Sequence, residues 1–221
     1  MVKGIRRRAL RFCFVWTGLF GGVFMISGAW TDPWVWAYAV TWMVLLLYAL
    51  LGLDDDLAKE RFRPPTRGAD RIGLAAIQIV ALAHLLLGAL DLGRWHLTAV
   101  PGPLRVTAFV GMAASGYLVF HAMQSNRFFS SVIRIQDERG HRVVDSGPYS
   151  RVRHPGYAGM IPLMALSGLA LGSWLAFGVG LGYAALILRR VLFEDRFLQA
   201  NLAGYRDYVE RVRYRLVPGI W

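Results

Sequence analysis

Residues 147–159 of this 221-residue chain read GPYSRVRHPGYAG. The segment lies between a polar, charged region and a long apolar run, and it combines three glycines with two prolines, two tyrosines and a histidine. Proline is favoured in the first turn of a helix, so His154-Pro155 marks the start of the helix that the apolar run predicts. The density of such residues indicates more than a connector between two helices.

The composition around this segment indicates a membrane protein. Hydrophobic residues make up 56% of the chain and the mean hydropathy is +0.41, whereas soluble domains usually carry about 45–50% apolar residues. The single cysteine, Cys13, excludes an internal disulfide framework and a cysteine metal site, and the other residues predict no metal site either. The first apolar run lacks an Ala-x-Ala-like cleavage site, so we expect a retained membrane span and not a removed signal peptide.

Apolar runs along the chain predict an all-α, polytopic membrane bundle of about six transmembrane helices, followed by a C-terminal cytoplasmic helix and tail. Each full span needs about 20 residues. The runs cover approximately residues 12–30, 34–53, 72–92, 98–123, 158–171 and 174–188. They divide the chain into an N-terminal four-helix region, 1–123, and a second region, 124–221, that holds a polar loop, a helical hairpin and the tail.

Local signals set the helix boundaries in two places. Asp32 and Pro33 predict the capped start of the second span. Pro162 should kink the fifth, because proline removes a backbone donor.

The basic residues predict the orientation in the membrane. With six spans, 23 of the 25 Lys and Arg residues fall on one side, and only Arg94 and Arg105 fall on the other. The positive-inside rule then places both termini and residues 147–159 in the cytoplasm. Anionic lipid head groups account for the net charge of +11 without nucleic acid as a partner.

Several other features have two interpretations. His84, near the middle of the third span, is either a functional group or a neutral, hydrogen-bonded core residue. The acidic residues 54–56 form either a metal or diphosphate site or, as we expect, a solvated helix end. Residues 143–144 form a brief strand or an extended pair. The glycines of 178–182 are no nucleotide loop, because no strand precedes them.

A second polar segment, 189–198, reads RRVLFEDRFL and follows the hairpin, which should bring it beside residues 147–159. Arg190 and Glu194 are four residues apart, so they share a helix face and can pair. An amphipathic helix and an extended end follow and could cover a pocket from the cytoplasm. In the alternative interpretation the arginines only anchor the protein to lipid head groups, and the acidic residues are solvated caps.

The motifs, taken in order, carry a family resemblance. They are Gly147-Pro148-Tyr149, Arg153-His154-Pro155-x-Tyr157-x-Gly159, Glu194-Asp195, Gly204-Tyr205-x-x-Tyr208 and Arg215-Leu216-x-Pro218. Residues 126–221, a little under half of the chain, closely resemble the isoprenylcysteine carboxyl methyltransferase and phospholipid methyltransferase superfamily of integral membrane enzymes. The resemblance implies an S-adenosylmethionine-dependent methyltransferase acting on a lipophilic small molecule, a lipid or a lipid-modified acceptor.

The resemblance also implies roles for individual residues. Arg190 and Glu194 are the implied catalytic residues. The implied cofactor-binding residues are Gly147, Pro148, Tyr149, Arg153, His154, Pro155, Tyr157, Gly159, Glu194, Asp195, Tyr205 and Tyr208. At Asp195 the family usually shows a second glutamate, so the contact made there is open.

Two alternatives to a methyltransferase remain at the level of sequence. Membrane sterol reductases have a similar His-Pro-x-Tyr segment and tail but use NADPH, and they are longer. A non-catalytic scaffold or a small transporter belongs to a different class. The residues do not choose between an anionic acceptor and an amine, for which Glu194 would be the natural base, and they do not predict the oligomeric state.

Overall fold

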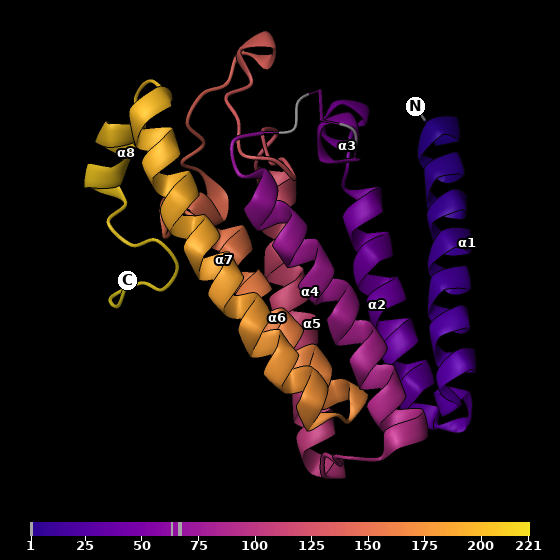
Figure 1. Cartoon of the computed structure of the whole chain (residues 1–221). Helices are drawn as coiled ribbons and strands as arrows, with labels where there is room; N and C mark the ends of the chain where they lie inside the picture. Colours follow the sequence, from indigo (N-terminus) through magenta and orange to yellow (C-terminus); the bar gives the residue numbers. More distant parts are fainter. Residues whose placement is uncertain (1, 63, 66–67) are drawn as a thin grey trace.

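The computed structural model describes the backbone of residues 2–62, 64–65 and 68–221, and the side chains of residues 14–61, 64–65 and 68–221. The described chain is helical and contains no β-strand, which confirms the all-α prediction and removes the strand considered for residues 143–144. The predictions for Cys13 and the basic leader fall on side chains outside this description. The helices form an elongated bundle (Figure 1).

The eight α-helices assigned within the described residues follow the apolar runs, with one short addition. They are α1 (Val2–Ser27), α2 (Pro33–Leu51), α3 (Asp55–Phe62), α4 (Arg71–Leu90), α5 (Gly102–Ser125), α6 (Pro155–Leu171), α7 (Trp174–Asn201) and α8 (Tyr205–Arg211). Four helical stretches are long and apolar enough to cross a membrane, namely α2, Arg71–Trp95, α5 and α7. Residues 14–27 and α6 are apolar but shorter, so the count of six spans stays a prediction.

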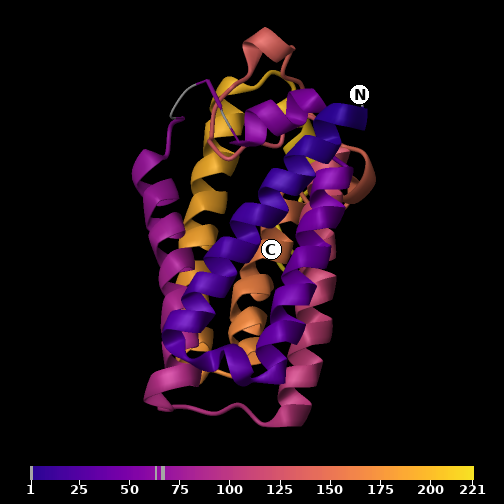
Figure 2. The same cartoon turned by 90° about the vertical axis from the view of Figure 1, so that its right-hand side faces the viewer.

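The two ends of the bundle differ, and Figures 1 and 2 show this from two sides. One end carries α3, α8 and the long connection 126–154; it is called the pocket end below. The other consists of the connections 28–32, 91–101 and 172–173 and is called the turn end. The start of α1 lies at the pocket end in both views.

Helix α6 lies at the centre of the bundle and packs against α5 and α7, with α4 against α7 on the outside. Small residues permit this packing. A Cβ atom at Gly159 would lie 2.7 Å from the Ser115 carbonyl oxygen of α5, and one at Gly168 would clash with the backbone of Phe177 in α7. Gly168 therefore permits the close packing of α6 against α7.

Several predicted helix boundaries were wrong, and each has a local cause. Helix α1 ends at Ser27 instead of Trp30, because Gly28 adopts a left-handed conformation with φ 82°. Helix α5 begins at Gly102 and not at Thr98, whereas α6 begins at Pro155, as the His154-Pro155 pair predicted. Asp32 does cap α2, since its carboxylate accepts a hydrogen bond from the Trp34 amide at 2.9 Å.

The largest boundary error concerns α7, which continues without a break to Asn201 instead of ending near Leu188. Charged residues interrupt the apolar run there but not the helix, because Arg, Leu and Glu are good helix formers. Helix α6 likewise continues through Pro162, and the kink expected there remains a prediction.

The acidic residues 54–56 lie at the start of helix α3. The Asp54 carboxylate accepts a hydrogen bond from the Leu57 amide at 2.7 Å and so caps the start of the helix. Asp56 forms an ion pair with Arg139 at 2.6 Å. The acidic run is thus a helix start tied to the connection 126–154, close to the solvated helix end that the sequence predicted.

His84 is a hydrogen-bonded core residue. Its Nδ1 lies 3.0 Å from the Ala176 carbonyl oxygen, and since a carbonyl only accepts, Nδ1 carries the proton. In the neutral ring Nε2 then accepts from the Ser167 hydroxyl at 2.7 Å, and the Tyr38 hydroxyl lies 3.2 Å from Ser167. This network joins α2, α4, α6 and α7 in the interior and fits the neutral interpretation.

Candidate active site

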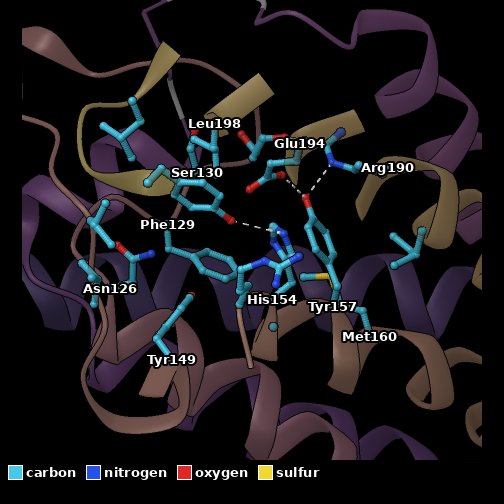
Figure 3. A pocket seen from close by; sticks show the side chains of 18 of the residues that line it. Asn126, Phe129, Ser130, Tyr149, His154, Tyr157, Met160, Arg190, Glu194 and Leu198 are labelled. Carbon is cyan, nitrogen blue, oxygen red and sulfur yellow. Dashed lines mark hydrogen bonds between the residues drawn. The ribbon is translucent and has the colours of Figure 1, made fainter. Parts of the chain in front are cut away.

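A cavity of about 950 Å³, part of it open to solvent, lies at the pocket end. Its walls come from the starts of α4 and α6, the last turns of α7, helix α8 and the connection 126–154 (Figure 3). The hairpin of α6 and α7 thus brings residues 147–159 and 189–198 to one cavity, as the sequence predicted.

Asp195 lies behind this cavity and holds the surrounding segments together. Its side chain is 1% exposed and accepts a bidentate pair of hydrogen bonds from Arg153, at 2.9 and 3.0 Å. It also accepts from His154 Nε2 at 3.1 Å, from Arg215 Nε at 3.0 Å and from the Tyr205 hydroxyl at 3.2 Å. One buried carboxylate therefore joins the start of α6, helix α8 and the tail.

The negative charge of Asp195 raises the pKa values of neighbouring side chains that lie outside the membrane-length helices. Burial alone would lower the pKa of Arg153, but the hydrogen bonds and charge of Asp195 outweigh it and raise that pKa. Burial, reinforced by the charge of Asp195, raises the pKa of the Tyr205 hydroxyl. Both groups consequently keep their protons, and with His154 Nε2 as a third donor the aspartate is fully satisfied.

Glu194, the neighbour of Asp195, faces the opposite way, toward the cavity (Figure 3). The Tyr157 hydroxyl donates to Glu194 Oε2 at 2.6 Å and accepts from Arg190 Nε at 2.9 Å. Arg190 and Glu194, which the sequence predicted to pair directly, are instead joined by the hydroxyl of Tyr157 from α6. Tyr157 fixes both side chains at the cavity wall.

Arg190 has one unused donor. Its Nε and Nη2 donate to Tyr157 and to the Ser131 carbonyl oxygen, the latter at 2.9 Å. Its Nη1 is buried and has no hydrogen-bond partner among the described residues, and the whole residue is only 4% exposed. A buried unsatisfied donor is costly, and on a side chain that lines the cavity it marks the position of an acceptor atom on a ligand.

Tyrosines form much of the remaining wall. Tyr149, Tyr205 and Tyr208 line the cavity, and the Tyr208 hydroxyl donates to the Tyr149 carbonyl oxygen at 2.7 Å. Burial raises the pKa of Tyr149, so its hydroxyl stays neutral at physiological pH. Aromatic rings in such a wall can stack on a planar base or contact a cation through their faces.

The tail after α8 is bound to the start of α6. The amides of Arg153 and His154 donate to the carbonyl oxygens of Tyr214 and Arg215, both at 2.9 Å. The tail thus lies behind the cavity wall, and the lining residues end at Tyr208 within the described chain. That the tail covers the pocket stays a prediction.

The structure brings eight of the predicted site residues to the cavity wall: Tyr149, Arg153, His154, Tyr157, Arg190, Glu194, Tyr205 and Tyr208. Gly147 and Pro148 instead form a 3-10 turn beside it, where Gly147 has φ 58°. Pro155 starts α6, and Gly159 faces α5. These four positions and Asp195 shape the wall from behind.

Sequence reasoning named no individual cavity residue in the first half of the chain, in residues 126–146 or at Met160. Arg61, Leu74 and Ile77 line the cavity, as do Asn126, Phe129, Ser130, Ser131, His141 and Met160. The guanidinium of Arg61 lies 5.5 Å from the centre of the Phe129 ring. Only the polar, aromatic run 126–131 carries a recognisable signal, since such a sequence is unusual immediately after a membrane helix.

The described part of the chain has four helices long and apolar enough to cross a membrane, and a polar, arginine-containing cavity lies at one end of the bundle, which indicates an integral membrane protein. Residues 107–200 match the Isoprenylcysteine carboxyl methyltransferase (ICMT) family, which confirms the family resemblance drawn from the motifs. This part of the chain is thus similar to a family of methyltransferases. No individual curated protein matches the chain.

Proposed function

We propose that this protein is an S-adenosylmethionine-dependent methyltransferase that acts on a lipid or lipid-modified acceptor at the cytoplasmic face of a membrane. The observation that carries the proposal is the cavity in which Tyr157 joins Glu194 to Arg190, while Arg190 keeps one buried donor free. The match to the ICMT family over residues 107–200 supports the same reaction class.

The residues present fit S-adenosylmethionine. The Glu194 carboxylate suits the positive sulfur or the ammonium group, and the free Nη1 of Arg190 suits an acidic oxygen of the cofactor or of the acceptor. Tyr149, Tyr205 and Phe129 provide aromatic faces for the adenine. His154, held by Asp195, completes the wall.

When bound, the cofactor supplies a methyl group on a positively charged sulfur. The chain itself then has to align two ligands and exclude water, which contributes up to about 7–11 kcal/mol in favourable intramolecular systems. Tyr157 holds Arg190 and Glu194 in fixed positions, so their charges need no reorganisation during the reaction. Asp195 keeps Arg153 and the tail in place behind them.

Apolar residues support a lipidic acceptor. Leu74 and Ile77 of α4, Met160 of α6 and Ile187 of α7 line the part of the cavity that continues toward the membrane helices. An acceptor with a polar group at Arg190 and an apolar chain along these residues would enter sideways from the bilayer.

The distribution of surface residues supports the orientation. Four exposed tryptophans, Trp30, Trp36, Trp95 and Trp174, lie at the turn end, as expected for the belt at a membrane boundary. Most basic residues lie toward the opposite end, which carries the cavity. By the positive-inside rule the pocket end, with the proposed site, faces the cytoplasm.

Calorimetric titration of the purified protein with S-adenosylhomocysteine tests the proposal. We expect binding that weakens about 10- to 100-fold in Glu194→Gln and His154→Ala, because hydrogen bonds to charged groups contribute about 1.5–3 kcal/mol. The matched control is Glu210→Gln, which removes an exposed carboxylate on α8 and should leave the affinity unchanged. No binding by folded wild-type protein, or binding of NADPH in its place, would overturn the assignment.

A further inference from the structure

Helix α3 places a buried carboxylate beside the candidate site. Glu60 is 3% exposed, and its Oε1 accepts a hydrogen bond from the Ser130 hydroxyl at 2.6 Å. Arg134 donates to both oxygens of Glu60, at 3.1 and 2.6 Å, and its side chain is only 8% exposed. Glu60 therefore binds both Ser130 and Arg134 and restrains this part of the connection.

The next residue of the same connection holds Arg190. The Ser131 carbonyl oxygen accepts from Arg190 Nη2 at 2.9 Å, and both Ser130 and Ser131 line the cavity. A continuous series of contacts thus runs from Glu60 through Ser130 and Ser131 to the guanidinium. Tyr157 holds the same guanidinium from the other side, at Nε.

The charge of Glu60 is stable in this position. Burial alone would raise its pKa, but the hydrogen bonds from Arg134 and Ser130 outweigh burial and keep the pKa below its usual value. A buried ion pair of this kind contributes little net stability, yet removal of one partner is strongly destabilising. We therefore ascribe to the Glu60–Arg134 pair a role in fixing the geometry of residues 130–131.

We propose that Glu60 is a positioning residue for Arg190, acting through Ser130 and the Ser131 carbonyl. The role rests on the proposed function only insofar as Arg190 serves methyl transfer. Glu60 lies outside residues 107–200, which match the family, so this half of the chain would contribute to the site by orienting a residue of the other half. A one-ångström misplacement of such a group can lower a rate about 100-fold.

Five variants separate positioning from general stabilisation of this end of the bundle. Glu60→Ala removes the carboxylate, and Ser130→Ala breaks the connection to it while both charges of the Glu60–Arg134 pair remain. Asp56→Asn and Glu138→Gln are the controls, because they weaken neighbouring ion pairs, with Arg139 and Arg134, that do not include Ser130. Glu60→Gln keeps an oxygen that can accept from Ser130 and serves as the rescue.

The first readout is the ¹⁵N NMR signal of the Arg190 Nε–H group in arginine-labelled protein, assigned by its loss in Arg190→Lys. We expect Glu60→Ala and Ser130→Ala to shift this signal and to speed its hydrogen exchange at least about tenfold. Glu60→Gln should recover most of the wild-type signal, and the two controls should match wild type. Equal effects in Ser130→Ala and the controls would overturn the positioning role.

The second readout is transfer of a labelled methyl group from S-adenosylmethionine to a total lipid extract. We expect the turnover to fall at least about tenfold in Ser130→Ala and to stay within twofold of wild type in the controls. Wild-type protein that neither transfers the label nor binds S-adenosylhomocysteine would overturn the proposed function, while the NMR comparison would still decide the role of Glu60. Unchanged turnover in Ser130→Ala with active wild type would overturn the positioning role alone.

Discussion

Two almost completely buried carboxylates, Asp91 and Asp195, lie at opposite ends of the bundle and are held in different ways. Asp91, at the turn end, is 0% exposed and receives only neutral donors: the amides of Leu97 and Thr98 and the hydroxyls of Thr98 and Ser173. Asp195, at the pocket end, is 1% exposed and receives two guanidinium groups. Neutral donors are enough to fix a turn between helices.

The charged donors of Asp195 do something that neutral donors do not. Arg153 reaches past the carboxylate and donates to the carbonyl oxygens of Val212 and Arg213, at 2.8 and 2.7 Å. An arginine offers five donors in a fixed plane, so one side chain can bind the carboxylate and the tail together. The pocket end thus uses charge to assemble segments from different parts of the sequence around a cavity.

The largest loss of stability in this comparison is expected for Asp195→Asn. The substitution leaves the cations Arg153 and Arg215 near each other without a compensating charge in a buried site, which should lower the free energy of unfolding by about 3–5 kcal/mol. Thermal unfolding in detergent micelles measures it, with Asp207→Asn on the exposed face of α8 as the control. A loss no greater than that of the control would show that the cations are solvated.

A smaller effect is expected for Asp91→Asn. The remaining amide oxygen still accepts from some of the donors, so the cost should be about 1–3 kcal/mol, the range for an incompletely satisfied buried group. The affinity for S-adenosylhomocysteine should stay within about twofold of wild type, because Asp91 lies at the opposite end from the cavity. A tenfold loss of affinity in folded Asp91→Asn protein would show that the two ends are coupled.

The smallest expected effect is a loss of stability at acid pH. It should arise from His141, which lies at the pocket end. Burial, reinforced by the positive charge of Arg134, lowers the pKa of His141 to about 4, whereas an unfolded chain has a histidine pKa of about 6.5. The unfolded chain therefore binds the proton first, so the free energy of unfolding is highest above pH 6.5 and falls as the pH drops toward 4.

Melting temperatures at pH 7.5 and pH 5 check this prediction. His141 Nδ1 lies 3.3 Å from the Gln136 amide, which donates to it, and an asparagine can supply a similar acceptor. His141→Asn should consequently show a smaller difference between the two pH values than wild type. An identical difference in both proteins would assign the acid sensitivity to other groups.

Local signals in the sequence were enough for most of the fold. Asp32 with Pro33, the apolar runs and the Gly172-Ser173 break predicted helices that the structure contains. The arrangement of residues 147–159 beside 189–198 followed from the short hairpin alone. These features depend on contacts within a few residues or on adjacent helices, which a pattern in one sequence can reveal.

The errors concern residues whose roles depend on distant partners. Glu60 and Arg61 lie in a short charged helix with no apolar periodicity, and their importance comes from Ser130 and Phe129, about 70 residues later. Glu194 and Asp195 are chemically similar neighbours, but consecutive residues of a helix point about 100° apart. The sequence alone could not say which would face the cavity and which would face Arg153.

Helix α7 sets the height of the candidate site relative to the membrane. It contains 28 residues, so its length is about 42 Å against about 30 Å of hydrocarbon. Glu194 stands 20 positions after Trp174, a rise of about 30 Å that places the carboxylate at the boundary when the tryptophan sits at the opposite one. If α7 spans the membrane in this way, a thicker bilayer would draw Glu194 and Arg190 into the hydrocarbon, and the proposed site would then depend on bilayer thickness.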